Sequence, residues 1–433
     1  MTTSDNEKRE REREIEMGDL SERKRIPIII FSDSPSAPTG LARITRDIAS
    51  RIFSKMPDFD IATFGYGGPG SVRLPFQQYN WKQNDYWLPL ELPAVWADFC
   101  SDTPGILLTI GDIQRFLQLS SPDLCLDKPF GGWMRQMRES GKLKLWGYFP
   151  IDAHGIDNKL TPQLGYTLQH YDRILVPSEW ARTIILNTLP DATVDVIPHG
   201  IDTTIFRPRD REYARNQFMG IAQGVMKWPT IPTIIPPDAL TIGIVATNQS
   251  RKDWGLAAET LSLLAKKSKE RKIFIWAHTD RLKNSDGWGL LELFGDFNLL
   301  PSTVITTGNL TDYAMSWCYN AMELTLGIGR GEGFGYPIFE SLFCATPCFA
   351  YNYGAHVEYM DKDWVSGIPG LRVEGPLNLL RPVGDPRQWA EQINKLYSAD
   401  NHLMRFPSEL DWERVWPRFE KWITDGVKEV KND

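Results

Sequence analysis

Short apolar runs that alternate with helical patterns constrain the fold of this chain more than any other feature of its sequence. The first run, Ile26–Phe31, is rich in isoleucine and predicts a buried strand. A loop rich in Ser, Pro and Gly follows, and Leu41–Phe53 then carries apolar residues at helical spacing. Further strands are predicted at Ile61–Phe64, Ile106–Ile110, Leu143–Phe149, Arg173–Val176 and Val194–Ile197, with a helix at Trp180–Leu189. This alternation predicts a parallel sheet with helices on both faces.

A second series of strands and helices begins near Leu240. Its predicted strands are Thr241–Ala246, Lys272–Ala277, Thr303–Thr306, Leu324–Ile328 and Pro347–Ala350, and its predicted helices are Trp254–Lys267, Tyr313–Ala321 and Pro337–Cys344. A length of 433 residues also exceeds one typical core. We therefore predict an α/β protein with two such units in tandem. Because ligands of open parallel sheets bind beyond the carboxyl ends of the strands, a site in a cleft between the units is expected.

The predicted boundaries follow changes in composition along the chain. Residues 1–25 are polar and charged, and are expected to form a mobile tail or a short solvated helix, not a signal peptide or membrane anchor. Residues 26–205 are predicted as the first domain, 206–239 as a proline-rich linker or insertion, and 240–407 as the second domain. The Trp-rich residues 408–433 are expected to end the chain in a closing helix.

Bulk composition argues against several classes of protein. No apolar run of roughly 18 residues occurs, so no membrane span is expected. Five cysteines spread over a long chain do not suggest a disulfide framework, and a reducing, cytoplasmic location is expected. The net charge of −7 disfavours a broad nucleic-acid-binding surface, because such binding depends on Lys and Arg that neutralise phosphates. The net charge does not exclude a local basic groove.

The sharpest motif of the chain lies in the segment Leu324–Glu340. A predicted strand, a run of alternating glycines and a predicted helix with proline at its start follow one another there. Glycines let a backbone approach a ligand closely, and a helix start offers N–H groups and partial positive charge, both of which suit phosphate. Glu332 and Glu340, with seven residues between them, would be repelled by phosphates and are best explained by hydroxyl groups. A ligand that bears both phosphate and hydroxyl groups is therefore indicated.

The last ten residues of this segment, Gly331-Glu332-Gly333-Phe334-Gly335-Tyr336-Pro337-Ile338-Phe339-Glu340, resemble the E-x7-E signature of the family-4 retaining glycosyltransferases of the GT-B fold. The family's sequence is also similar in other segments, namely Val176–Glu179, Val196–Asp202, Phe206–Pro208, Pro347–Glu358 and Ser408–Trp416. The resemblance covers most of the chain beyond the tail and is weakest from Gly67 to Ser101. It implies two Rossmann-like domains that face each other across a cleft, with a C-terminal helix that returns to the first domain.

The resemblance also implies roles for single residues. Glu332 would contact hydroxyls of the transferred sugar, and Glu340 would bind the ribose. The backbone of Gly333, Phe334 and Gly335 would lie against the sugar and the diphosphate. The implied activity is retaining transfer of a hexose from a nucleotide-diphosphate sugar, a UDP- or GDP-sugar by expectation, to an acceptor hydroxyl. No metal and no further cofactor are expected.

The cations of the donor site depart from the family pattern. The family places an arginine and a lysine near the donor diphosphate, and Lys252 fits the lysine position, whereas Thr247 or Asn248 stands at the arginine position. Either Arg251 takes over that role, or Lys252 holds the diphosphate together with N–H groups of the loop. Fixed cations are needed in both cases, because the leaving nucleoside diphosphate gains negative charge. Lys252 is therefore predicted to act in catalysis, and Asn248 and Arg251 to line the donor site.

Two places in the first domain are candidates for the far side of the expected cleft. Gly40 is similar to the family's glycine loop that faces the diphosphate, although an N-cap role for Thr39 explains this position equally well. Asp152 and His154 end a predicted strand and are expected to face the cleft, where they would orient the acceptor hydroxyl. Turn or cap roles stay open for both residues.

Neither metal-like pattern in the sequence predicts a metal site. Asp58-Phe59-Asp60 spells D-x-D, the metal signature of a different glycosyltransferase fold, but it stands before a predicted strand and is interpreted as a strand-entry turn. Cys344 and Cys348 lie close together, but no second Cys/His pair stands at zinc-ligand spacing.

Two other functions and several acceptors stay open. A sugar-nucleotide epimerase can share the fold, and a catalytically silent carbohydrate-binding protein can keep its motifs. The acceptor is a glycan, a lipid-linked sugar, a protein or a modified nucleic-acid base, the last disfavoured by the net charge. Aromatic residues in Tyr79–Phe99 can stack on sugars or bases, but core packing is the preferred interpretation. Gly220–Pro237 is interpreted as an insertion that braces the domains or contacts a large acceptor.

Overall fold

The computed structural model describes residues 25–67, 73–81, 88–225, 235–267, 272–375, 377–398 and 405–432. The predicted tail up to residue 24, the aromatic residues Tyr86 and Trp87, and residues 226–234 of the predicted insertion lie outside these ranges. The chain divides into two compact units. One comprises the residues up to Tyr148 together with Thr167–Ile174, and the other comprises Phe149–Tyr166 together with the residues from Leu175 onward.

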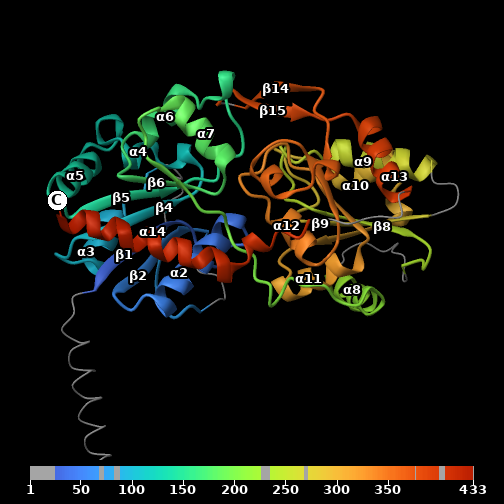
Figure 1. Ribbon diagram of the computed structural model, residues 1–433, viewed down its shortest axis with the longest axis horizontal. Helices are drawn as coiled ribbons and strands as arrows, with labels where there is room; N and C mark the ends of the chain where they lie inside the picture. Colours follow the sequence, from blue (N-terminus) through green and yellow to red (C-terminus); the bar gives the residue numbers. More distant parts are fainter. Residues whose placement is uncertain are drawn as a thin grey trace, which may run out of the picture. The chain divides into compact units, whose positions relative to one another are not determined.

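Seven strands form the first sheet in the order β3-β2-β1-β4-β5-β6-β7 (Figure 1). They are β1 (Ile26–Asp33), β2 (Phe59–Tyr66), β3 (Gln77–Asn80), β4 (Gly105–Ile110), β5 (Leu143–Tyr148), β6 (Arg173–Val176) and β7 (Val194–Val196). Strand β1, inside the sheet, pairs in parallel with β2 and β4. Because β1 and β4 are buried on both faces, they are continuous apolar runs with little alternation. The helices of this part are α2 (Gly40–Lys55), α3 (Leu92–Phe99), α4 (Leu117–Ser120), α5 (Lys128–Glu139), α6 (Pro162–Leu168) and α7 (Glu179–Thr188).

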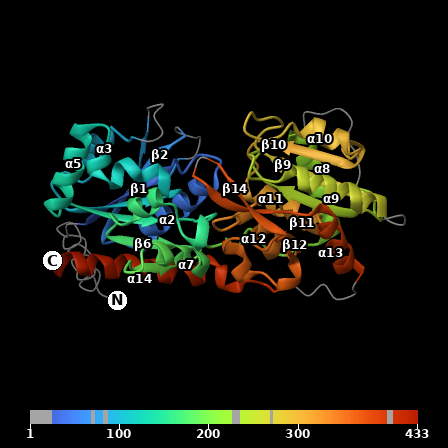
Figure 2. The same ribbon diagram turned by 90° about the horizontal axis from the view of Figure 1, so that it is seen from above.

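Six strands form the second sheet in the order β10-β9-β8-β11-β12-β13, and all of their pairings are parallel. They are β8 (Leu240–Val245), β9 (Ile273–Thr279), β10 (Thr303–Thr307), β11 (Leu324–Gly327), β12 (Cys348–Tyr351) and β13 (Val365–Ser366). The helices are α8 (Arg211–Val225), α9 (Trp254–Lys267), α10 (Leu290–Asp296), α11 (Asp312–Ala321), α12 (Tyr336–Phe343) and α13 (Pro386–Ser398). Helix α9 packs with α10 and α13 on one face, and α8 packs with α11 on the other (Figures 1 and 2).

The neighbouring strands β8 and β11 bring the two loops of the predicted donor site together. Both strands run in the same direction, so the loops that follow them emerge at the same edge of the sheet. Lys252 and Gly329 form an isolated antiparallel bridge there, and the backbone N–H of Arg330 donates to the carbonyl of Arg251 at 3.0 Å.

Two elements lie outside the second sheet. Strands β14 (Gly370–Glu374) and β15 (Leu379–Val383) form an antiparallel hairpin. Helix α14 (Trp412–Asn432) ends the chain beside β7, where Trp422 Nε1 donates to Asp195 Oδ2 at 2.8 Å. The predicted C-terminal helix that returns to the first sheet is therefore present.

The strands and helices predicted for the two sheets agree with the structure to within two residues at each end, and the closing helix, predicted from residue 408, begins at Trp412. Their patterns are local, so the periodicity of the sequence was enough to find them. Residues 206–239, predicted as a linker or insertion, contain α8, which packs against α11. None of the described helices is both long enough and apolar enough to cross a lipid bilayer.

Candidate functional site

The glycine-rich loop between β11 and α12 packs against residues 150–152. Gly331 has a φ of 130°, and a Cβ at this position would clash with the backbone oxygen of Asp152. A Cβ at Gly333 would clash with the backbone oxygen of Pro150. These two glycines therefore admit a close approach of the protein's own chain, whereas the sequence suggested only a close approach of a ligand.

Lys252 and Glu332 form a largely buried ion pair at this loop. Lys252 Nζ donates to Glu332 Oε1, and the two side chains are 10% and 17% exposed. Burial, followed by the neighbouring charge of Arg251, lowers the pKa of Lys252 to about 8. Burial alone would raise the pKa of Glu332, but Lys252 and Arg251 hold that pKa below its ordinary value. The pair thus places a cation and an ionised carboxylate side by side just before α12.

Three more charged residues extend the pair into a row of alternating charges. Arg251 lies 3.9 Å from Glu332 Oε2 through its Nη1 and 3.9 Å from Asp152 Oδ2 through its Nε. Arg381 Nη2 lies 3.2 and 3.1 Å from the two carboxylate oxygens of Asp152. The charge row is Arg381, Asp152, Arg251, Glu332 and Lys252, and all five residues belong to the second unit. Its three cations exceed its two carboxylates by one charge, which suits an anionic ligand.

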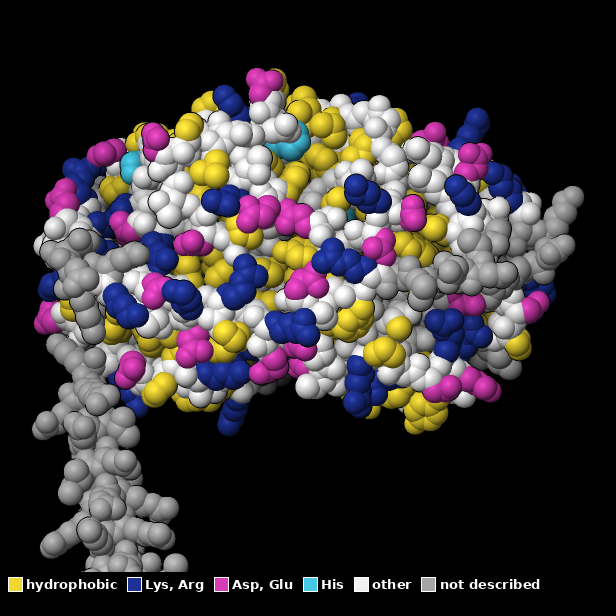
Figure 3. Space-filling model, in the orientation of Figure 1, with side chains coloured by type: hydrophobic (Ala, Val, Ile, Leu, Met, Phe, Trp, Pro, Cys, Tyr) yellow, Lys and Arg dark blue, Asp and Glu magenta, His cyan; other side chains and the backbone are white. Residues whose placement is uncertain are grey.

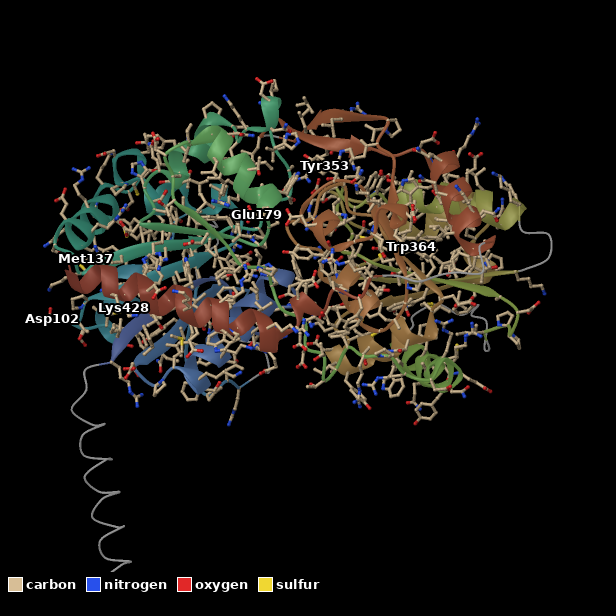
Figure 4. All side chains as sticks on the ribbon, viewed as in Figure 1. Asp102, Met137, Glu179, Tyr353, Trp364 and Lys428 are labelled. Carbon is tan, nitrogen blue, oxygen red and sulfur yellow. The ribbon has the colours of Figure 1, made fainter. Side chains whose placement is uncertain are left out.

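His154 does not join the charge row. The residue is 5% exposed, its Nδ1 lies 2.7 Å from the carbonyl of Gly155, and its backbone N–H donates to the Tyr353 hydroxyl at 3.3 Å. The rings of Tyr353, labelled in Figure 4, and Trp180 lie 5.5 and 6.1 Å from the imidazole. Aromatic packing therefore buries the His154 ring, and its predicted role toward the acceptor hydroxyl stays a prediction. Asp152 keeps a 26% exposed carboxylate.

The side-chain amide of Asn248 bonds to the backbone around the loop that follows β8. The residue is completely buried. Its Nδ2 donates to the carbonyls of Trp288 and Arg281 at 2.8 and 3.2 Å, and its Oδ1 accepts from the N–H of Trp288 at 2.8 Å. Contact between Asn248 and the donor stays a prediction. The Asn248 amide fixes the backbone that leads to Lys252.

Replacing Asn248 by alanine should lower the free energy of unfolding by about 2–4 kcal/mol, because buried backbone groups lose their hydrogen-bond partners. Urea unfolding measures the effect. The matched control is N187A, since the Asn187 side chain is exposed and makes one bond, to the Asn158 carbonyl at 3.1 Å. That control should change stability by less than about 1 kcal/mol. Equal losses in both variants would contradict the structural role of Asn248.

The other residues of the predicted donor site are largely buried. Glu340 lies in α12, is 5% exposed, and accepts a hydrogen bond from the Tyr319 hydroxyl at 2.7 Å. The Phe334 ring is buried, with its centroid 4.6 Å from that of Phe339. Gly335 is the N-cap of α12, with a φ of 97°. The burial of the Phe334 ring is consistent with the predicted use of its backbone, which stays a prediction.

Gly40 opens helix α2 in the first unit. The preceding Thr39 caps the helix, since its Oγ1 accepts from the N–H of Ala42 at 3.0 Å. The same hydroxyl donates to Asp33 Oδ2 at 2.5 Å, and Asp33 pairs with Arg115 at 2.9 Å. The N-cap interpretation of Thr39 is confirmed, and donor contact by Gly40 stays a prediction.

Neither metal-like pattern of the sequence gathers ligands in the structure. Asp60 lies in β2 and pairs with Arg25 at 3.2 Å. Cys344 and Cys348 are buried free thiols. Across the described ranges, no group of three or more His, Cys, Asp or Glu residues is arranged to hold a metal ion.

Sequence reasoning missed two arginines of this region. Arg381 lies in β15, 229 positions from its partner Asp152, and no motif marks it. Arg330 pairs with Glu374 of β14. The alternation of apolar and charged residues in Gly370–Glu374 is a hairpin signal, but it does not specify what the hairpin contacts.

Comparison with known proteins gives matches in structure. No protein-family model and no curated protein matches the sequence. Sucrose-phosphate synthase from Thermosynechococcus elongatus aligns with 94% of this chain and 100% of its own, with a TM-score of 0.66 and 14% identity. HepE from Anabaena in complex with UDP and glucose aligns over 94% and 100%, with a TM-score of 0.62 and 12% identity. The E. coli trehalose-6-phosphate structure bound with UDP-2-fluoro glucose aligns over 94% and 99%, with a TM-score of 0.59 and 12% identity.

These matches define the class of fold. The matched proteins are glycosyltransferases of the GT-B fold, and this chain has the same two parallel sheets with helices around them. The GT-B fold implied by the E-x7-E resemblance is therefore confirmed. At these identities the likeness establishes the fold, and an activity can be inferred only from the residues of the site.

Proposed function

We propose that this protein transfers a sugar from a nucleoside-diphosphate sugar to an acceptor hydroxyl, with retention of configuration at the anomeric carbon. The Lys252–Glu332 pair carries the proposal, because it sets a cation and a hydroxyl-binding carboxylate beside a helix N-terminus in a GT-B fold. The complex of HepE with UDP and glucose supports this ligand class. Retention follows from the resemblance of the E-x7-E segment.

In the proposed reaction, Lys252 and Arg251 hold the diphosphate of the donor. Negative charge grows on the diphosphate as its bond to the anomeric carbon breaks, and fixed cations stabilise that charge. Glu332 accepts hydrogen bonds from sugar hydroxyls once Lys252 turns to the diphosphate. Glu340 binds the ribose, and the backbone of 333–335 lies against the sugar. The acceptor hydroxyl, oriented by Asp152, attacks from the face that the nucleotide leaves, and its proton passes to the leaving diphosphate.

The pH dependence of donor capture should report the charge of Lys252. Its pKa is about 8, so kcat/KM for the donor should fall as the pH rises above about 8. A bound diphosphate favours the charged lysine, so the fall in kcat is expected at higher pH. The unfolded chain binds this proton more tightly than the folded protein does. The free energy of unfolding should therefore rise with pH between about 8 and 10.5.

The variant K252R tests whether Lys252 causes this fall in kcat/KM. Arginine keeps its charge up to a pH of about 12, so the fall in kcat/KM near pH 8 should disappear. Steady-state kinetics from pH 6 to 10 at constant ionic strength give the profile. A fall near pH 8 that persists unchanged in K252R would show that another group causes it.

The surface charge bears on the choice of acceptor. On the face shown in Figure 3, Lys and Arg side chains are interspersed with Asp and Glu. The net charge of the chain is −7. Nucleic-acid binding depends on a patch of positive charge. We therefore propose hydroxyls of a glycan, a lipid-linked sugar or a protein as acceptors before a nucleic-acid base.

A thermal-shift panel of UDP-, GDP-, ADP- and TDP-sugars tests the donor proposal. A donor present at about 100 times its dissociation constant should stabilise the fold by about 2.7 kcal/mol and raise the melting temperature. The donor that does so identifies the nucleotide. No shift with any of these compounds at millimolar concentration would contradict the proposal.

A further inference from the structure

The β14–β15 hairpin delivers one side chain into the charge row. Arg381 lies in β15, its side chain is 11% exposed, and it binds both carboxylate oxygens of Asp152. Its Nη1 also donates to the backbone oxygen of Arg330 in the glycine-rich loop at 3.1 Å. The hairpin belongs to neither sheet (Figures 1 and 2), so the sheets themselves do not require an arginine here.

We infer that Arg381 is a positioning residue of the donor site: it holds Asp152 so that this carboxylate does not neutralise Arg251. The inference rests on the proposed function, because it assigns Arg251 to the donor diphosphate. It supplies a reason why this chain works without the arginine that related enzymes place before the lysine.

The distances within the charge row support this role. Asp152 lies within 3.1–3.2 Å of Arg381 and 3.9 Å from Arg251, so its close partner is Arg381. A guanidinium fork matches a carboxylate in geometry as well as in charge. Within the described residues, Arg251 is the other cation within 4 Å of the Asp152 carboxylate. Without Arg381, a shift of roughly 1 Å would bring Asp152 into hydrogen-bonding range of Arg251 and neutralise it.

The hairpin has other attachments that should keep it in place when Arg381 is replaced. The backbone N–H of Leu380 donates to the carbonyl of His154 at 2.7 Å, and the Tyr353 hydroxyl donates to the carbonyl of Leu380 at 2.5 Å. Glu374 of β14 pairs with Arg330. A substitution of Arg381 therefore tests the role of its guanidinium group, because the hairpin itself should stay in place.

The experiment measures the dissociation constant of UDP by calorimetry, with GDP as a second probe. R381A should bind the preferred diphosphate about tenfold more weakly, because Asp152 then competes for Arg251. The double variant R381A/D152N should recover to within about threefold of the wild type, since the amide carries no charge to neutralise Arg251. The matched control is R372A, which removes an exposed arginine opposite Arg381 in the hairpin and should change binding less than twofold.

Each outcome decides between the explanations. Unchanged binding in R381A overturns the inference. Weak binding that D152N does not restore also overturns it, because Arg381 would then act by shaping the loop. If R381A does not fold, R381Q, which keeps the side-chain length and loses the charge, replaces it in the same comparison. If the wild type binds neither UDP nor GDP, the proposed donor itself is contradicted, and this result is separate from any effect of Arg381.

Discussion

Replacing Lys252 by alanine should lower the turnover of the nucleotide sugar by a factor of about 10²–10³, the range seen when a fixed electrostatic donor is removed from an active site. Lys252 pairs with Glu332 in the structure, and in the proposed reaction it moves to the diphosphate, where the charge of the leaving group grows. The loss should therefore appear in kcat. Release of nucleoside diphosphate at saturating donor measures it.

The stability of the K252A variant must be measured separately from its turnover. Removing one partner of a buried pair leaves an uncompensated charge, which costs up to about 3–5 kcal/mol, although Glu332 can take up a proton and reduce this penalty. Turnover should therefore be compared well below the melting temperature of the variant. The control K267A removes an exposed lysine of α9, paired with Glu391 at 3.6 Å, and should keep turnover within about twofold. Near-normal turnover in folded K252A would contradict the assigned role.

Replacing Glu332 by alanine should lower turnover by a similar factor, about 10²–10³, through a different interaction. Glu332 is proposed to bind sugar hydroxyls, and hydrogen bonds to an ionised carboxylate are the strong ones. The charges of Lys252 and Arg251 hold its pKa below the ordinary value, so Glu332 is ionised at neutral pH. Values of kcat and KM for the donor measure the effect.

Two further variants are needed to interpret the turnover of E332A. E259A removes an exposed glutamate of α9 and should leave turnover unchanged within about twofold. The double variant K252A/E332A removes both buried charges, so it should be more stable than either single variant while it stays inactive. A folded E332A protein with normal turnover, or a double variant that regains activity, would remove Glu332 from the donor site.

The glycine-rich segment could be predicted because its signals are local. A short apolar strand, alternating glycines and Pro337 at the helix start follow one another within a few residues. Such patterns need no distant partner. The pairing of Lys252 with Glu332 follows from two neighbouring strands, β8 and β11, whose loops meet at one edge of the sheet.

The surroundings of three residues could not be predicted because their partners lie far along the chain. Asn248 occupied the position of a ligand-binding side chain, but its bonds to the backbone of Trp288 leave no mark in the sequence. His154 follows a strand like a site residue, yet Tyr353 and Trp180 bury its ring. Arg381 was missed because an ion pair over 229 positions has no local pattern.

The chain lacks the arginine that the glycosyltransferases it resembles place before the lysine, and the structure shows what lies at this position. Thr247 or Asn248 stands at that position, and the amide of Asn248 holds the loop. Arg251 lies between the carboxylates of Asp152 and Glu332 at 3.9 Å from each. We therefore propose that Arg251 replaces the missing cation, and that the pairing of Asp152 with Arg381 keeps its charge available to the diphosphate.

The fate of a nucleotide sugar in the presence of the protein tests glycosyl transfer most directly. Mass spectrometry after long incubation with UDP-, GDP-, ADP- and TDP-sugars should show that the wild type converts one donor to nucleoside diphosphate and free sugar, with water as a slow acceptor. K252A and E332A should leave the same donor intact. Conversion of the donor to an isomeric nucleotide sugar without release of diphosphate would indicate an epimerase and contradict the proposed transfer.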